Sequence, residues 1–184
     1  MSQNDFKNLS RNLRAAVYGA SDGIITTFAV VAGSTGAKLP AGVVLILGIS
    51  NLVADGLSMG ASDFLGEQSQ RQLKQTKKRS LTGLSPVWQT GLITFASFVL
   101  AGALPLLPFT ASFVGITIAN PFLISIIATA TTMFTVGSLR TTFIKGRWWV
   151  NGLQMLLIGS ITAATAYFLG YFVENLIGFI PSNL

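Results

Sequence analysis

Five long apolar segments constrain the fold of this chain more than any other feature. They run approximately over residues 15–33, 42–65, 89–109, 112–139 and 152–180. Each is long enough to cross roughly 30 Å of hydrocarbon as a helix. The sequence therefore predicts an all-α integral membrane protein with five transmembrane helices, in which residues 1–184 form a single membrane domain.

The overall composition agrees with this prediction and limits the chemistry. Of the 184 residues, 51% are hydrophobic and only 10% are charged, whereas soluble domains carry about 25% charged residues. The chain has no histidine and no cysteine, so thiolate and imidazole sites are excluded. A metal site would have to use oxygen ligands or a methionine thioether. No nucleophile–base constellation is visible either, and we do not expect an enzyme.

The distribution of lysine and arginine predicts the orientation. Eleven of the twelve basic residues lie in segments 1–14, 66–88 and 140–147. The twelfth, Lys38, lies between the first and second apolar segments, on the opposite side of the membrane. Because basic loops stay in the cytosol, this asymmetry predicts a cytosolic N-terminus and a short basic cytosolic loop at 66–88. Segment 1–14 would be cytosolic or interfacial. Anionic lipid headgroups are natural partners for these charges, and nucleic acid is not expected as a partner.

Two acidic residues lie deep inside apolar segments. Asp22 is about a third of the way along the first segment, and Asp55 is near the middle of the second. An aspartate at mid-membrane costs roughly 2.5–3.5 kcal/mol on insertion scales, and such residues often mark ion paths. Neither segment contains a lysine or arginine to neutralise them, so a cation is the natural partner. The alternative is that each is protonated and hydrogen-bonded between helices.

The second segment contains the stretch SNLVADGLSMGASD, which places four polar or soft side chains one helical turn apart. Asn51, Asp55, Met59 and Asp63 are spaced by four, so a helix puts them on one slowly drifting stripe. Carboxylate oxygens beside a thioether suit borderline ions such as Fe²⁺ or Mn²⁺ better than Ca²⁺ or Mg²⁺. Plain packing is the alternative for Met59.

Together with Asp22 of the first segment, these four residues form the predicted metal site. Asp22 and Asp55 are also the predicted proton-coupling residues, since a buried carboxyl group favours a proton and a bound cation displaces it.

Glycine pairs flank both polar regions. Gly19 and Gly23 bracket Asp22, and Gly56 and Gly60 bracket Met59. This spacing allows helix backbones to approach closely, which predicts a tight helix pair around a site. Five spans are few for a transporter, so we expect a two-fold homodimer with the ion path at its interface and a copy of Asp22 on each side.

Four stretches resemble the vacuolar iron transporter family, which includes the yeast vacuolar iron and manganese importer and nodulin-like membrane proteins. They are SDGIITTFAVVAGSTGA, VVLILGISNLVADGLSMGASDFL, AGALPLLPF and GLQMLLIGSITAATAYFLG. The resemblance implies a five-helix protomer in a two-fold dimer, with the ion path between the two first spans. It also implies export of cytosolic Fe²⁺ or Mn²⁺ in exchange for protons. By motif match Asp22 would be the carboxylate in the path and Met59 the thioether ligand.

Two departures from the family pattern stand out. Relatives of the plant and yeast type have a glutamate where this chain has Asn51. They also carry a long glutamate-rich cytosolic domain that collects metal, whereas residues 66–88 are short and basic, with Glu67 as their one acidic residue. A basic loop repels cations, so the chain resembles a short member of the family without the metal-collecting domain.

The leading interpretation is a proton-coupled antiporter that moves Fe²⁺ or Mn²⁺ out of the cytosol. The metal would pass Asp63 and Glu67 and then bind between Asp22, Met59 and Asp55. The ion is the substrate, and no cofactor is expected. A bacterial plasma membrane is favoured over a vacuolar one. The alternative is a non-transporting membrane scaffold whose basic loop binds anionic lipid or an acidic partner.

Overall fold

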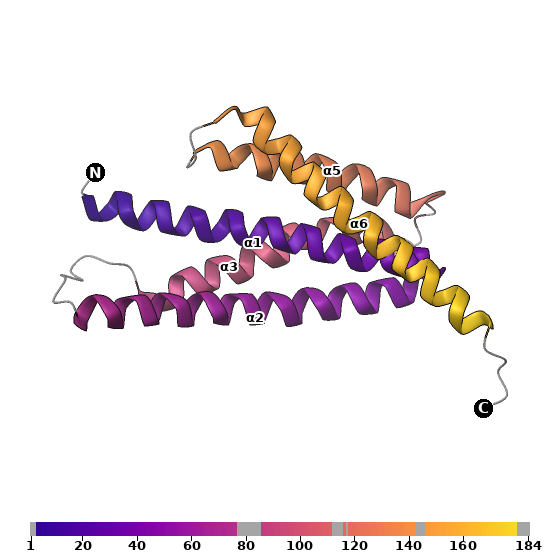
Figure 1. The fold of residues 1–184 in the computed structure, drawn as a ribbon, viewed down its shortest axis with the longest axis horizontal. Helices are drawn as coiled ribbons and strands as arrows, with labels where there is room; N and C mark the ends of the chain where they lie inside the picture. The colour runs from indigo at the N-terminus through magenta and orange to yellow at the C-terminus, as the bar shows by residue number, and fades with distance from the viewer. Residues whose placement is uncertain (1–2, 77–85, 112–115, 117, 143–145, 180–184) are drawn as a thin grey trace.

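Every regular element in the described part of the computed structural model is a helix (Figure 1). The structure describes residues 3–76, 86–111, 116, 118–142 and 146–179. In chain order the helices are α1 (Gln3–Gly36), α2 (Ala41–Thr76), α3 (Val87–Gly102), the 3₁₀ turn η1 (Leu104–Leu106), α4 (Leu107–Ala111), α5 (Pro121–Leu139), the 3₁₀ turn η3 (Arg140–Thr142) and α6 (Trp148–Phe179).

Five stretches of these helices are long and apolar enough to cross a membrane. They are Asn8–Gly36, Ala41–Lys74, Val87–Ala111, Pro121–Leu139 and Trp148–Gly178. The prediction of an all-α protein with five long apolar helices is therefore confirmed. Many large apolar side chains are exposed along α2 and α6, as expected of surfaces that face lipid or another protein.

The helix ends differ from the apolar segments in three places. Helices α1 and α2 continue into polar sequence, so that part of the predicted 66–88 loop is the end of α2; residues 77–85 lie outside the described residues. The third span is interrupted by η1 at Pro105. The helix of the fourth span, α5, begins at Pro121, where the Asn120 side chain accepts a hydrogen bond from the Leu123 amide at 3.1 Å. Residues 112–115 and 117 of that predicted span are outside the described residues.

Helix α1 is the centre of the bundle. It contacts α2 and α3 on one side and α5 and α6 on the other (Figure 1). Its side chains Ile24, Thr27 and Val31 are completely buried, as is Phe98 of α3. Helices α1 and α2 run antiparallel, and α3 packs against both of them.

Glycines determine how closely α3 approaches its two neighbours. A Cβ atom at Gly19 or Gly23 of α1 would collide with main-chain atoms of α3. On the other side, a Cβ at Gly60 of α2 would lie 2.8 Å from the carbonyl oxygen of Gly91 in α3. The predicted close approach of helices is therefore present, but within one chain the partner of these glycines is α3.

We expect Gly23→Ala to destabilise the protein. The new methyl group would lie 2.9 Å from the Phe98 Cα, and because the neighbour is backbone it cannot turn aside. Such overpacking typically costs about 1–3 kcal/mol. Gly66→Ala is the matched control, since nothing lies within 4 Å of the added atom and alanine favours helix. Thermal unfolding in detergent should show a lower midpoint for Gly23→Ala only; equal midpoints would contradict the close α1–α3 contact.

Candidate functional site

A polar cavity of about 510 Å³ opens between α1 and α2. Its lining residues are Tyr18 and Asp22 from α1, and Asp55, Ser58, Met59, Ser62 and Asp63 from α2. Four of the five predicted metal-site residues are among them. Asn51, one turn before Asp55, does not line the cavity.

Helical spacing explains why these side chains share one cavity. Tyr18 and Asp22 are four apart on α1, and the α2 residues are three or four apart, so each helix presents a single polar face. The two helices are antiparallel neighbours, and these faces meet across the cavity. Asp22 and Asp55 line this one cavity from two different helices, so two negative charges face the same space.

Neither of these two aspartates has a protein partner for its carboxylate. Within the described part of the chain, the side chains of Asp22 and Asp55 form no hydrogen bond and no ion pair. The Thr26 hydroxyl, one turn after Asp22, donates to the Asp22 main-chain oxygen at 2.8 Å and leaves the carboxylate alone. Interhelical hydrogen bonding, the alternative role for both residues, has no contact to support it among the described residues.

Asp63 differs from the other two acids because it is anchored. Its Oδ2 accepts a hydrogen bond of 2.8 Å from Oγ1 of Thr94, a completely buried residue of α3. Sequence reasoning missed Thr94. The available signal was a hydroxyl in an apolar segment, and Thr90 and Ser97 give the same signal in the same helix.

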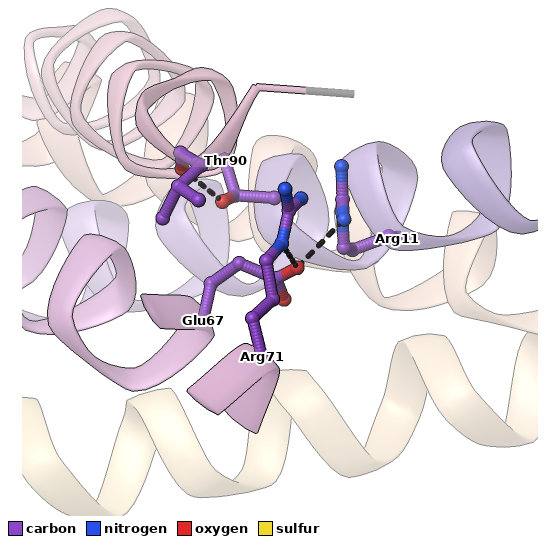
Figure 2. Close-up of polar contacts among 5 residues, drawn as sticks. Arg11, Glu67, Arg71 and Thr90 are labelled. Carbon is purple, nitrogen blue, oxygen red and sulfur yellow. Dashed lines mark hydrogen bonds and ion pairs between the residues drawn. The ribbon is translucent and has the colours of Figure 1, made fainter. Parts of the chain in front are cut away.

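Glu67 lies beyond Asp63 on α2 and is already paired. Its Oε1 accepts hydrogen bonds from Nη1 of Arg11 at 2.7 Å and from Nε of Arg71 at 2.8 Å (Figure 2). All three side chains are largely buried. The predicted route of the metal past Glu67 stays a prediction, and along it the Glu67 carboxylate is held by two guanidinium groups.

The described part of the chain does not bring a full set of anionic ligands together. Among the described residues, no group of three or more aspartates and glutamates is close enough to hold a metal ion. The cavity instead combines the facing pair Asp22 and Asp55 with the Met59 thioether and hydroxyl groups. Carboxylate, hydroxyl and thioether groups together suit a borderline divalent cation.

Five membrane-length helices, two of which enclose an acidic cavity, define a multi-pass integral membrane protein. Within that class, the chain belongs to the VIT family, whose sequence model matches residues 13–85 and 78–171. This is a family of transporters and not of enzymes, and the resemblance seen in the sequence is confirmed.

The similar proteins include three that are named vacuolar iron transporters. The one from Plasmodium falciparum is 27% identical, over 89% of this chain and 83% of its own length. Vacuolar iron transporter 1 of Oryza sativa is 25% identical, over 84% of this chain and 82% of its own. The protein from Toxoplasma gondii is 36% identical over a shorter stretch, 42% of this chain and 26% of its own length.

We expect Glu67→Gln to destabilise the α1–α2 contact. The substitution leaves the Arg11 and Arg71 guanidinium groups facing a neutral amide in a largely buried place, which costs on the order of 3 kcal/mol. The control is Glu174→Gln, which breaks the exposed 3.2 Å pair with Lys38 and should cost less than about 1 kcal/mol. Thermal unfolding of the two variants in detergent compares the costs. A larger loss for Glu174→Gln would contradict the assignment.

Proposed function

We propose that this protein moves a divalent transition metal, Fe²⁺ or Mn²⁺, out of the cytosol in exchange for protons. The observation that carries the proposal is the facing pair Asp22 and Asp55, which have no partner among the described residues although they lie inside membrane-length helices. The names of the relatives, which are iron transporters, support iron as a substrate.

The charge of the aspartate pair favours a divalent cation. Two carboxylates that repel each other gain from any cation placed between them, and the gain grows with the cation's charge and with burial. Met59 adds a thioether, which favours Fe²⁺ or Mn²⁺ over the harder Mg²⁺ and Ca²⁺. Asp63 lines the same cavity and adds negative charge there, although among the described residues the three carboxylates do not form one close group.

Exchange for protons follows from the same pair. After the metal leaves, Asp22 and Asp55 again carry two charges in one cavity, and protons can neutralise them by binding to the carboxylates. A protonated pair binds metal weakly, so release of the protons and capture of the metal are coupled at one place. Antiport then requires only that the cavity be reached from each side in turn.

Two ion pairs at opposite ends of the bundle support the proposed orientation. The Arg11–Glu67 pair joins the first turns of α1 to the last turns of α2, so the basic stretches of these two helices share one end. The Lys38–Glu174 pair joins the α1–α2 connection to the end of α6 at the other. We assign the first end to the cytosol because basic residues remain there. A bacterial plasma membrane is the proposed location.

A second copy of the chain would complete the site. Tyr18 is 65% exposed at the edge of the cavity, and Asp55, Ser58 and Ser62 are also exposed. Leaving these groups against hydrocarbon would cost roughly 2.5–3.5 kcal/mol for each aspartate alone. A two-fold homodimer that pairs the α1–α2 faces would cover them and bring a second set of ligands to the path.

Asn51 belongs to the proposed path although it does not line the cavity. Its Nδ2 atom is buried and has no hydrogen-bond partner among the described residues. It lies one turn along α2 from Asp55, towards the end that we place outside the cytosol. A buried amide N–H donor that lacks a partner is costly unless water reaches it, so this group supports a water-filled continuation of the path.

We expect Asp22→Asn to abolish proton-driven metal flux. The amide has nearly the same shape but can neither carry the charge nor exchange the proton. The measurement is uptake of Fe²⁺ or Mn²⁺ into proteoliposomes with an imposed pH gradient. The control is Glu174→Gln, an acid-to-amide change far from the cavity that should keep the flux. Wild-type flux from Asp22→Asn would remove the mechanism, and no flux from the wild type would favour the scaffold alternative.

We expect a cysteine at position 18 to form a disulfide between two copies of the chain. The chain has no cysteine of its own, so Tyr18→Cys reports on one position only. The comparison variant is Ile161→Cys, which places a thiol on the exposed side of α6. After mild oxidation in membranes, a denaturing gel should show dimers for Tyr18→Cys. A dimer band for Ile161→Cys alone would place the interface on α6 instead.

A further inference from the structure

We propose that Thr94 of α3 is a positioning residue of the metal site. Thr94 holds the Asp63 side chain so that one carboxylate oxygen is directed at the cation. This inference rests on the proposed function, because it assigns a role in metal binding. Thr94 does not line the cavity, and it acts through its hydrogen bond of 2.8 Å to Asp63.

The hydroxyl of Thr94 donates its hydrogen bond to a side chain of another helix and not to its own helix. A threonine or serine in a helix commonly donates to a carbonyl three or four residues earlier. The two other hydroxyl residues of α3 do this: Thr90 donates to the Val87 oxygen at 3.0 Å, and Ser97 donates to the Ile93 oxygen at 2.5 Å. Thr94 instead donates across to the Asp63 carboxylate of α2. A charged acceptor makes this the stronger bond.

The main chain at Thr94 is itself held in place. Its carbonyl oxygen lies directly against Gly19 of α1, where no side chain would fit, and it also accepts a hydrogen bond of 3.2 Å from the Ser97 hydroxyl. One turn earlier, Gly91 packs against Gly60 of α2. Thr94 therefore stands on the part of α3 that is fixed to both neighbouring helices, and its side chain is completely buried.

The consequence is a division of roles among the three cavity acids. Asp63 has one oxygen occupied by Thr94, and its other oxygen is available to a cation. Asp22 and Asp55 have no such anchor among the described residues. A ligand that is already ordered loses less entropy when it binds, so an anchored Asp63 should tighten metal binding without taking part in the exchange of protons.

The test compares Thr94→Val with Thr94→Ser and Thr90→Val. Valine keeps the shape and removes the hydroxyl, serine restores the hydroxyl, and Thr90→Val removes an equally buried hydroxyl whose bond stays within α3. Mn²⁺ is the probe: bound ion is measured on the purified full chain by loss of the free Mn²⁺ electron paramagnetic resonance signal. Flux is measured in proteoliposomes.

For Thr94→Val we expect the Kd and the KM for Mn²⁺ to rise on the order of tenfold, as for loss of one hydrogen bond to a charged group. The maximal rate should stay within about twofold of wild type. Thr94→Ser and Thr90→Val should bind as wild type does. A purely structural role would lower the thermal midpoint and the amount of active protein but leave the Kd unchanged, and that result would overturn the proposal.

A double-substitution cycle with Asp63→Ala keeps the proposal falsifiable if Thr94→Val folds poorly. Thr94→Ala then replaces the valine variant, and it should weaken Mn²⁺ binding in the wild type but add nothing in the Asp63→Ala protein, which lacks the acceptor that asparagine would keep. An equal loss in both backgrounds would overturn the role. If the wild type itself neither binds nor moves Mn²⁺ or Fe²⁺, the proposed function fails, whereas unchanged affinity in a Thr94 variant of an active protein removes only the positioning role.

Discussion

The packing of α3 against both α1 and α2 is the contact on which the rest of the structure depends. It is possible because Gly23 of α1 and Gly60 of α2 carry no side chain where they meet α3. With α3 held there, α1 and α2 keep their polar faces towards each other at the cavity and their glycine faces towards α3. Main-chain contact of this kind is a general means of joining helices in a membrane, because the hydrophobic effect does not drive helices together there.

Four of the acidic residues fall into two groups with different roles, apart from Asp63, which Thr94 anchors. Glu67 and Glu174 lie near opposite ends of the helices and are paired with arginine or lysine, where they join neighbouring helices. Asp22 and Asp55 lie between those ends, face each other, and have no such pair in the described structure. A charge that is left without a partner inside a membrane protein needs a compensating ion, and this is why the pair carries the functional proposal.

The position of Glu67 also bears on how a metal would reach the cavity. The predicted route of the metal passes Asp63 and Glu67. Two guanidinium groups hold the Glu67 carboxylate, which leaves the approach to the cavity basic at that corner of the bundle. Under the proposed function, selection of the metal therefore depends on the cavity itself, where Met59 and the three aspartates are located.

The sequence by itself determined what depends on spacing along one helix: five apolar helices, and a stripe that brings Asp55, Met59 and Asp63 to one face. The energetic cost of Asp22 and Asp55 in hydrocarbon also indicated an ion path. Only the tertiary structure decided which helix covers each face. The partner of the glycine pairs, the bond from Thr94 to Asp63 and the two arginines on Glu67 are contacts between distant segments, most of them between different helices. Helical periodicity states which way a side chain points, but what it meets there depends on how the whole chain packs.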